Sequence, residues 1–140
     1  MNLPLEGLKI LDLSHALAGP FCSTMLADYG AQVIKIEPPG KGDIARAWGT
    51  KLPGGETDYF VGLHRNKQGI VLDLKNAEGK GTFLRMVERC DVVLENFRPG
   101  TLVKLGLIMK WRASVIPALF IAQSQALGKM APTAIAPHLT

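Results

Sequence analysis

Strand-like and helix-like segments alternate along the first hundred residues, and this alternation constrains the fold more than any other feature of the sequence. Residues 9–13 and 32–37 are short apolar runs typical of buried strands, and the second is rich in β-branched residues. Between them, Pro20 suits the first turn of a helix, apolar residues recur at helical spacing as far as Tyr29, and Gly30 suits its end. This strand–helix–strand order is long enough to form a right-handed parallel crossover.

The alternation resumes after two stretches rich in glycine and proline, at residues 38–43 and 48–57, which we interpret as ordered loops. Residues 70–74 predict a third strand, Asn76 is a good N-cap for the helix that follows, and residues 91–95 predict a fourth strand. Strands that alternate with helices indicate an α/β fold with a Rossmann-like parallel sheet, whose ligands bind where the strands end.

The positive charge of the chain belongs mostly to its C-terminal tail. Residues 1–107 carry 13 Lys and Arg against all 12 acidic residues, whereas the last 33 residues carry three basic residues and no acidic one, which gives the formal net charge of +4. No arginine-rich stripe with interleaved aromatic residues is present. Nucleic acid is therefore not an expected partner.

Composition narrows the class of protein further. No window holds the roughly 18–20 consecutive apolar residues that a membrane span needs, and the first residues lack the basic start of a secretory signal. Cys22 and Cys90 form neither a disulfide framework nor a metal-binding CxxC pair. The sequence therefore predicts a reduced, cytoplasmic protein with no membrane partner and no metal site.

Three loops at the predicted strand ends carry groups that could bind an anion. Residues 14–20 precede a helix N-terminus, although they lack the G-x-G-x-x-G spacing of dinucleotide-binding folds. Lys67 and Lys75 bracket the third strand and either grip a polyphosphate or solubilise the loop ends. Arg98 lies in a Pro-Gly turn after the fourth strand. The residues alone thus indicate a domain that binds a phosphate-bearing ligand. We expect His15 to form a structural hydrogen bond and Cys22 to serve in packing.

Several short motifs occur in a fixed order along residues 5–107. They are residues 7–14 (GLKILDLS), 18–20 (AGP), 26–31 (LADYGA), 33–37 (VIKIE), Gly42-Asp43 with Arg46, 66–67 (NK), 72–75 (LDLK) and 95–100 (ENFRPG). The series resembles the N-terminus of the class III CoA-transferases, the family of formyl-CoA transferase, carnitine-CoA transferase and, by fold, α-methylacyl-CoA racemase. The resemblance implies that residues 1–107 form the N-terminal part of the large domain of such an enzyme.

The resemblance also implies which residues would line a CoA site. They are Leu17, Ala18, Leu72, Asp73, Leu74, Lys75, Asn96, Phe97, Arg98 and Lys104. Two positions depart from the formyl-CoA branch, because Leu17 replaces a glutamine implicated in the reaction and Pro38 replaces an arginine near CoA. A CoA thioester would be the substrate, with no permanently bound cofactor.

By the same resemblance, the activity is the transfer of CoA between an acyl-CoA and a small carboxylic acid, within an interlocked homodimer. The nucleophilic aspartate of the family lies beyond residue 140, so no carboxylate here is assigned that role and this chain is expected to be inactive. Two rival functions stay open: an acyl-CoA racemase of the same fold, and a non-catalytic fragment that binds CoA or a partner. A downstream His/Asp acid-base arrangement would favour the racemase.

From Ile108 the composition changes, since residues 108–140 contain no Asp or Glu. If one nucleotide is missing at this junction, residues 108–117 back-read as Asp-Tyr-Glu-Val-Ala-Arg-Glu-Arg-Asn-Pro, which is the continuation that the family would show. We therefore predict that residues 108–140 are a frameshifted, non-native tail, mobile or loosely helical, that leaves apolar surface of residues 1–107 uncovered.

Sequencing the locus tests this interpretation of the tail. We expect the family motifs to reappear one base away from the reading frame after Leu107. An intact frame, without such motifs in the neighbouring one, would show that the tail is native.

Overall fold

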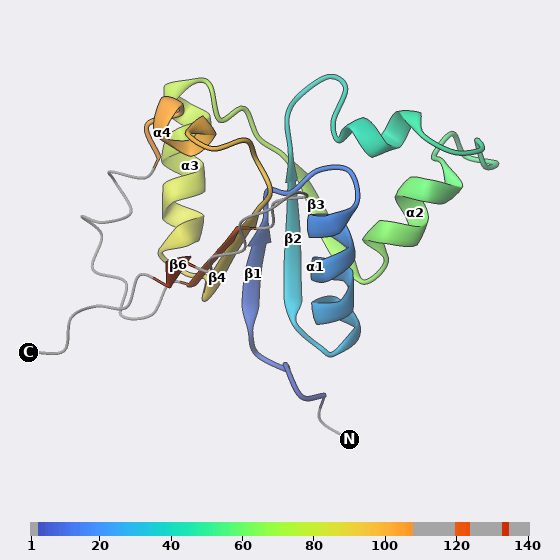
Figure 1. Cartoon of the computed structure of the whole chain (residues 1–140), viewed down its shortest axis with the longest axis horizontal. Helices are drawn as coiled ribbons and strands as arrows, with labels where there is room; N and C mark the ends of the chain where they lie inside the picture. The colour runs from blue at the N-terminus through green and yellow to red at the C-terminus, as the bar shows by residue number, and fades with distance from the viewer. Residues whose placement is uncertain (1–2, 108–119, 124–132, 135–140) are drawn as a thin grey trace, which may run out of the picture.

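The computed structural model describes residues 3–107, 120–123 and 133–134, and in these residues the chain forms a six-stranded sheet. The strand order is β3-β2-β1-β4-β5-β6 (Figure 1). Neighbouring strands are parallel, except that β6 runs antiparallel to β5. The strands are β1 (Lys9–Asp12), β2 (Gln32–Glu37), β3 (Lys67–Val71), β4 (Val92–Glu95), β5 (Phe120–Gln123) and β6 (Thr133–Ala134).

Helices cover both faces of the sheet. Helix α1 (Ala18–Asp28) packs on one face with α2 (Asp58–His64) beside it, and α3 (Ala77–Val87) packs on the other (Figure 1). The α3 side holds the larger apolar core, which is built around Phe83, and the α1 side holds a smaller one. Two short helices, η1 (Ile44–Ala47) and α4 (Thr101–Lys104), lie in the connections that follow β2 and β4. Within the described part of the chain, no helix is long and apolar enough to span a bilayer.

The structure confirms the predicted α/β fold and its parallel sheet, and β2 has the predicted bounds. The Asn76 side chain caps α3 as expected, because its Oδ1 accepts a hydrogen bond of 2.7 Å from the Gly79 N–H. The third strand was misplaced: β3 begins at Lys67 and ends at Val71. Its apolar continuation at residues 72–74 leaves the sheet and packs against the α3-side core instead.

The described residues of the tail form strands, whereas we expected a mobile or loosely helical tail; the helical alternative is wrong at these positions. Strand β5 pairs with β4 in parallel register, Val92 opposite Phe120, and β6 pairs with β5. The edge of β4 offers unpaired backbone groups, which an added strand satisfies. The other residues of the predicted frameshifted tail, 108–119, 124–132 and 135–140, lie outside the described residues.

Replacement by alanine is expected to have opposite effects on stability at two glycines of α3. A Cβ on Gly79 would lie 2.0 Å from the Asp73 carbonyl oxygen, whereas a Cβ on Gly81 would meet nothing closer than the Arg85 guanidinium at 3.7 Å. We expect Gly81→Ala to raise the free energy of unfolding by about 0.5–1 kcal/mol. Gly79→Ala should lower it by about 1–3 kcal/mol, because the contacting atom belongs to the backbone. Urea titration measures both, and equal effects would contradict the close packing of α3 on residues 72–75.

Candidate functional site

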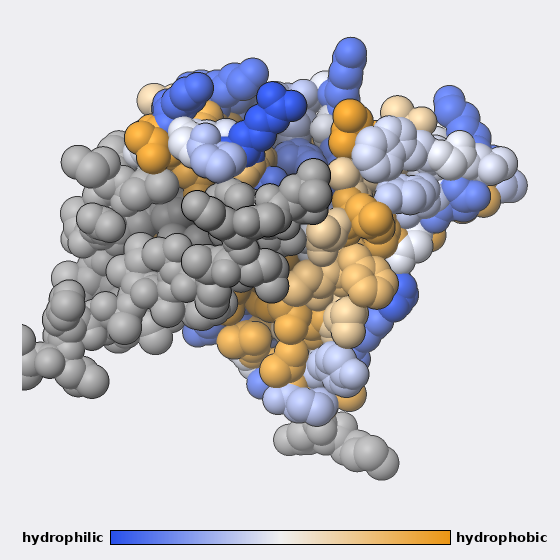
Figure 2. Space-filling model, viewed as in Figure 1, coloured by the Kyte–Doolittle hydropathy of each residue, from blue (hydrophilic) through white to orange (hydrophobic). Residues whose placement is uncertain are grey.

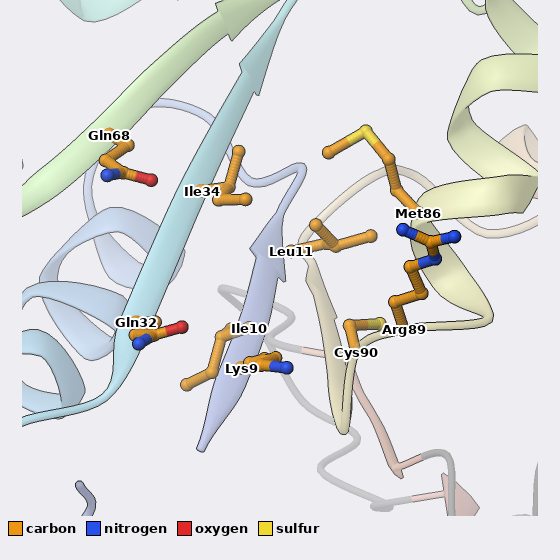
Figure 3. Close-up of a pocket in the computed structure, with 9 residues that line it drawn as sticks. All are labelled: Lys9, Ile10, Leu11, Gln32, Ile34, Gln68, Met86, Arg89 and Cys90. Carbon is orange, nitrogen blue, oxygen red and sulfur yellow. The ribbon is translucent and has the colours of Figure 1, made fainter. Parts of the chain in front are cut away.

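Two cavities lie at opposite ends of the sheet. One, of about 300 Å³, opens near the beginnings of β1–β3, where Gln32 and Gln68 face Met86 in the last turn of α3 and Arg89 just beyond it (Figure 3). The other, of about 210 Å³, lies where the strands end. Parallel α/β sheets bind ligands at the carboxyl ends of their strands, so the second cavity is the candidate site. Its walls are Leu13, His15, Ile36, Glu37, Pro38, Leu72, Asp73, Leu74, Lys75, Phe97, Thr101 and Leu105.

The ten predicted CoA-site residues divide into three groups. Five line the candidate site: Leu72, Asp73, Leu74, Lys75 and Phe97. Leu17, Ala18 and Asn96 do not line it: Leu17 and Asn96 lie in the loops that carry His15 and Phe97, and Ala18 is the first residue of α1. Arg98 and Lys104 are exposed, the first in the turn that ends at Gly100 and the second at the end of α4, in the connection that also supplies the wall residues Phe97, Thr101 and Leu105. His15 is a wall residue that was not predicted, although its loop was.

Residues 72–75 form a wall that is fixed by hydrogen bonds. The Leu72 N–H donates to the Glu37 carbonyl oxygen at 2.9 Å, at the end of β2. Asp73 Oδ1 accepts from the Lys75 N–H at 2.9 Å, and Oδ2 accepts from the Asn76 amide at 3.1 Å. Leu72 and Leu74 therefore present a rigid apolar surface, while Lys75 stays exposed at its rim.

Asn96 clamps the opposite wall. Its Oδ1 accepts from the His15 N–H at 2.8 Å, and its Nδ2 donates to the His15 carbonyl oxygen at 2.7 Å. The His15 ring lies 5.5 Å from that of Phe97, centre to centre. The next residue, Ala16, has a φ of 70°, a conformation that is uncommon for a residue with a Cβ. Its N–H donates to Asp43 Oδ1 at 3.0 Å, which holds the loop in this shape.

A buried network of charges lies beneath the same loop. Lys35 is 2% exposed, and its Nζ lies 2.9 Å from Asp43 Oδ2 and donates to the Ser14 carbonyl oxygen. Asp12 accepts from the Ser14 N–H at 2.9 Å and pairs with Lys67, whose Nζ lies 3.3 Å from Asp12 Oδ2. The two lysines and two aspartates balance each other, as buried charges must.

Lys67 therefore neither grips a polyphosphate nor solubilises a loop end, so both predicted alternatives are wrong for this residue. Its side chain is 1% exposed, and its Nζ donates to the Pro20 carbonyl oxygen at 2.9 Å and the Ser23 hydroxyl at 2.7 Å. Burial lowers the pKa of Lys67 to about 8, although the negative charge of Asp12 acts to raise it. The neighbouring Asn66 donates to Asp28, so it points away from the cavity as well.

The environment of Asp43 favours its charged form. Burial acts to raise the pKa of this carboxyl, but hydrogen bonds from His15 and from the Ala45 and Ala16 N–H groups, with the charge of Lys35, outweigh it. They hold the pKa of Asp43 far below its usual range. A carboxylate stabilised this strongly is a structural anchor and a poor nucleophile.

The candidate site is therefore equipped for binding. It offers an apolar cavity with an exposed cation, Lys75, at its rim, and two further exposed cations, Arg98 and Lys104, in the next connection. Such a combination suits a ligand with an apolar or aromatic part and phosphate groups. In the part of the chain that the structure describes, no three His, Cys, Asp or Glu side chains are grouped to hold a metal ion.

Sequence comparison identifies relatives of known activity. The sequence model of CoA-transferase family III matches residues 5–138. A succinyl-CoA–D-citramalate CoA-transferase of Chloroflexus aurantiacus is 45% identical over 129 residues, which cover 92% of this chain and 32% of that protein. An acetyl-CoA:oxalate CoA-transferase of Acetobacter aceti is 44% identical over 131 residues, which cover 94% and 33%. The family match continues past Leu107, whereas the motifs that carry the predicted resemblance end there.

Two solved structures are similar to this chain in both sequence and fold. A CAIB/BAIF family protein from Brucella suis superposes with a TM-score of 0.82 at 37% identity, over 97% of this chain and 37% of that one. A Mycobacterium tuberculosis protein superposes with a TM-score of 0.80 at 40% identity, over 98% and 38%. The chain thus spans about a third of the length of the curated relatives it matches.

Replacing Asp43 with asparagine tests the buried network. Asparagine keeps an oxygen for the Ala16 N–H but leaves the Lys35 cation unpaired, so Asp43→Asn should lower the free energy of unfolding by about 3–5 kcal/mol at pH 7. Because the pKa of Asp43 is lower in the folded state, its contribution is present above about pH 4 and is lost as the pH falls. Urea titrations at pH 7 and pH 3 should therefore differ less for the variant.

Asp28→Asn is the matched control, because Asp28 forms an exposed ion pair with Arg65. Exposed pairs contribute little to stability. An Asp43→Asn chain as stable as the Asp28→Asn chain at pH 7 would show that the Lys35–Asp43 pair is not a structural anchor.

Proposed function

The chain belongs to CoA-transferase family III, and from this membership we propose that the protein moves CoA between an acyl-CoA and a small carboxylic acid. One observation carries the proposal for these residues. Five residues implied by the family resemblance, from two separate connections, line one apolar cavity where the strands end. We infer that this cavity is part of the CoA site.

The proposed binding mode follows from the residue types. Leu72, Leu74 and Phe97 would contact apolar or aromatic parts of CoA, because burial of such surface is favourable. Lys75, Arg98 and Lys104 would contact its phosphates, and they are exposed and have no ion pair within the described residues. Leu17, Ala18, Asp73 and Asn96 complete the proposed site. Asn96 would act by holding His15 and the turn at Phe97 in place.

The proposed reaction places the nucleophile outside these 140 residues. An aspartate carboxylate attacks the thioester carbonyl, the C–S bond breaks, and CoA leaves as a thiolate with formation of a mixed anhydride. The thiolate then attacks the aspartyl carbonyl, which releases the acid and leaves a CoA thioester on the enzyme. A CoA thioester is thus the substrate, and no permanently bound cofactor is proposed. Within the described residues, the buried Asp12 and Asp43 each form an ion pair with a lysine. This agrees with a role of these residues in binding and not in nucleophilic attack.

The proposal extends to the setting of the enzyme. Cys22 and Cys90 are free thiols, which supports a reducing, cytoplasmic location. The proposed assembly is an interlocked homodimer, with acyl-CoA and a carboxylic acid as small-molecule partners and without nucleic acid or membrane partners.

Calorimetric titration of the 140-residue chain with CoA tests the proposed site. We expect weak binding, and we expect Lys75→Ala and Arg98→Ala each to weaken it about three- to tenfold through loss of a phosphate contact. Arg89→Ala is the matched control, because this cation lines the cavity at the other end of the sheet. Absence of CoA binding, or equal effects of Arg89→Ala and Arg98→Ala, would contradict the proposed site.

Transferase assays test the proposed position of the nucleophile. The chain should show no turnover with acyl-CoA donors and a panel of carboxylic acids, because it lacks the attacking aspartate. Turnover above the uncatalysed rate, retained after purification to constant specific activity, would place a nucleophile within these residues.

A further inference from the structure

One carboxylate in the wall of the candidate cavity is poorly suited to the proposed ligand. Glu37, the last residue of β2, lines the cavity, and its side chain is 6% exposed. Figure 2 shows hydrophilic residues, in blue, along the top of the view, the side toward which β1 and β2 run in Figure 1. A buried negative charge on this side would repel the phosphates of CoA, because charges interact more strongly away from water. Binding of such a ligand therefore requires a group that offsets this charge.

Arg46 pairs with the Glu37 carboxylate in a bidentate geometry. Its Nε donates to Glu37 Oε2 and its Nη2 donates to Oε1, each at 2.7 Å, and the Asp43 N–H donates to Oε2 at 2.8 Å. Burial acts to raise the pKa of Glu37, but these hydrogen bonds, with the charges of Arg46 and Lys35, outweigh it and hold the pKa below its usual value. Glu37 is therefore ionised, and Arg46 is the cation that pairs with it directly.

Arg46 is itself held in place by the connection between β2 and α2 and by α2. Its Nη1 donates to both carboxylate oxygens of Glu56, at 2.7 and 2.8 Å, and its guanidinium lies 3.8 Å from the centre of the Phe60 ring. An aromatic face attracts a cation in this position. Gly42 leaves space for the ion pair, since a Cβ there would lie 2.5 Å from Glu37 Oε2 and 3.0 Å from Arg46 Nε. These contacts fix the guanidinium beside the Glu37 carboxylate.

We propose that Arg46 is a positioning residue of the proposed CoA site: it neutralises Glu37 and so lets the cavity accept a ligand with several negative charges. The inference rests on the proposed function. The other acidic wall residue, Asp73, is half-buried, and the Lys75 N–H and the Asn76 amide donate to it. Glu37 is more deeply buried, so water screens its charge less, and the affinity for an anion depends more on its partner.

Calorimetric titration of the 140-residue chain with CoA tests the role of Arg46. Arg46→Gln removes the charge and should raise the dissociation constant about tenfold, whereas Arg46→Lys keeps the charge and should retain most of the affinity. Glu37→Gln in the Arg46→Gln chain should restore the dissociation constant to within about threefold of that of the unsubstituted chain, because no unpaired carboxylate remains. A residue that only stabilises the fold would give no such rescue. The effect of Arg46→Gln should also shrink in about 0.5 M salt, which screens the repulsion.

Arg65→Gln is the matched control, because it removes the same charge from an exposed ion pair with Asp28, ahead of the start of β3. It should leave the affinity for CoA within about twofold. Failure of the unsubstituted chain to bind CoA would overturn the proposed function and this inference with it. Binding by the unsubstituted chain, without rescue in the double variant, would overturn the inference alone and assign Arg46 to fold stability.

Circular dichroism separates loss of the fold from loss of affinity in these variants. If Arg46→Gln unfolds the chain, Glu37→Gln alone provides the test, because its amide oxygen can still accept from the Asp43 N–H. This variant should lower the dissociation constant for CoA about two- to fivefold, since Arg46 then attracts the phosphates without an opposing carboxylate. An unchanged or raised dissociation constant would show that the charge of Glu37 does not oppose binding, and would overturn the inference.

Discussion

The pairing of Lys35 with Asp43, buried between the sheet and the loop that follows β1, is the interaction on which the candidate site depends. Lys35 comes from the middle of the sheet and Asp43 from the connection after β2, and together they contact Ser14 and Ala16. A buried pair of this kind contributes little net stability compared with apolar packing, but removal of one partner is costly. We interpret it as a device that selects one loop conformation, because Ala16 would not adopt its positive φ without the bond to Asp43.

The same network explains the unusual character of α1. A helix that covers a sheet normally turns its apolar side chains inward. Here Ser23 contacts the buried charges, Thr24 donates to the Leu63 carbonyl oxygen of α2, and large residues such as Phe21 face outward. Gly19 is part of this arrangement, since a Cβ there would lie 2.2 Å from that of Ser14. The close approach of α1 to the loop and the inward position of Ser23 thus belong to one arrangement around the buried charges.

Local patterns predicted the parts of this fold that depend on local interactions. The β-branched run of β2 and the Asn76 cap follow from neighbouring residues, and both were predicted correctly. The third strand was misplaced because an apolar run at residues 70–74 looks the same whether it pairs in a sheet or lines a cavity. The Asn96 clamp on His15 joins residues 81 positions apart, so spacing could not reveal it. The burial of Lys67 likewise depends on partners in β1 and α1.

The proposed division between binding and catalysis follows from the partners of the charged side chains in the described residues. Asp12 and Asp43 are neutralised by lysines and excluded from water, so neither is free to attack a thioester. Glu95 is also buried, and burial raises its pKa, but its oxygen accepts from the Phe97 N–H and fixes the turn that carries this wall residue. The exposed cations are the opposite case, because they are free to meet a ligand. The candidate site of a chain about a third as long as its relatives therefore fits the proposed binding role, in which the reacting carboxylate comes from elsewhere in the fold.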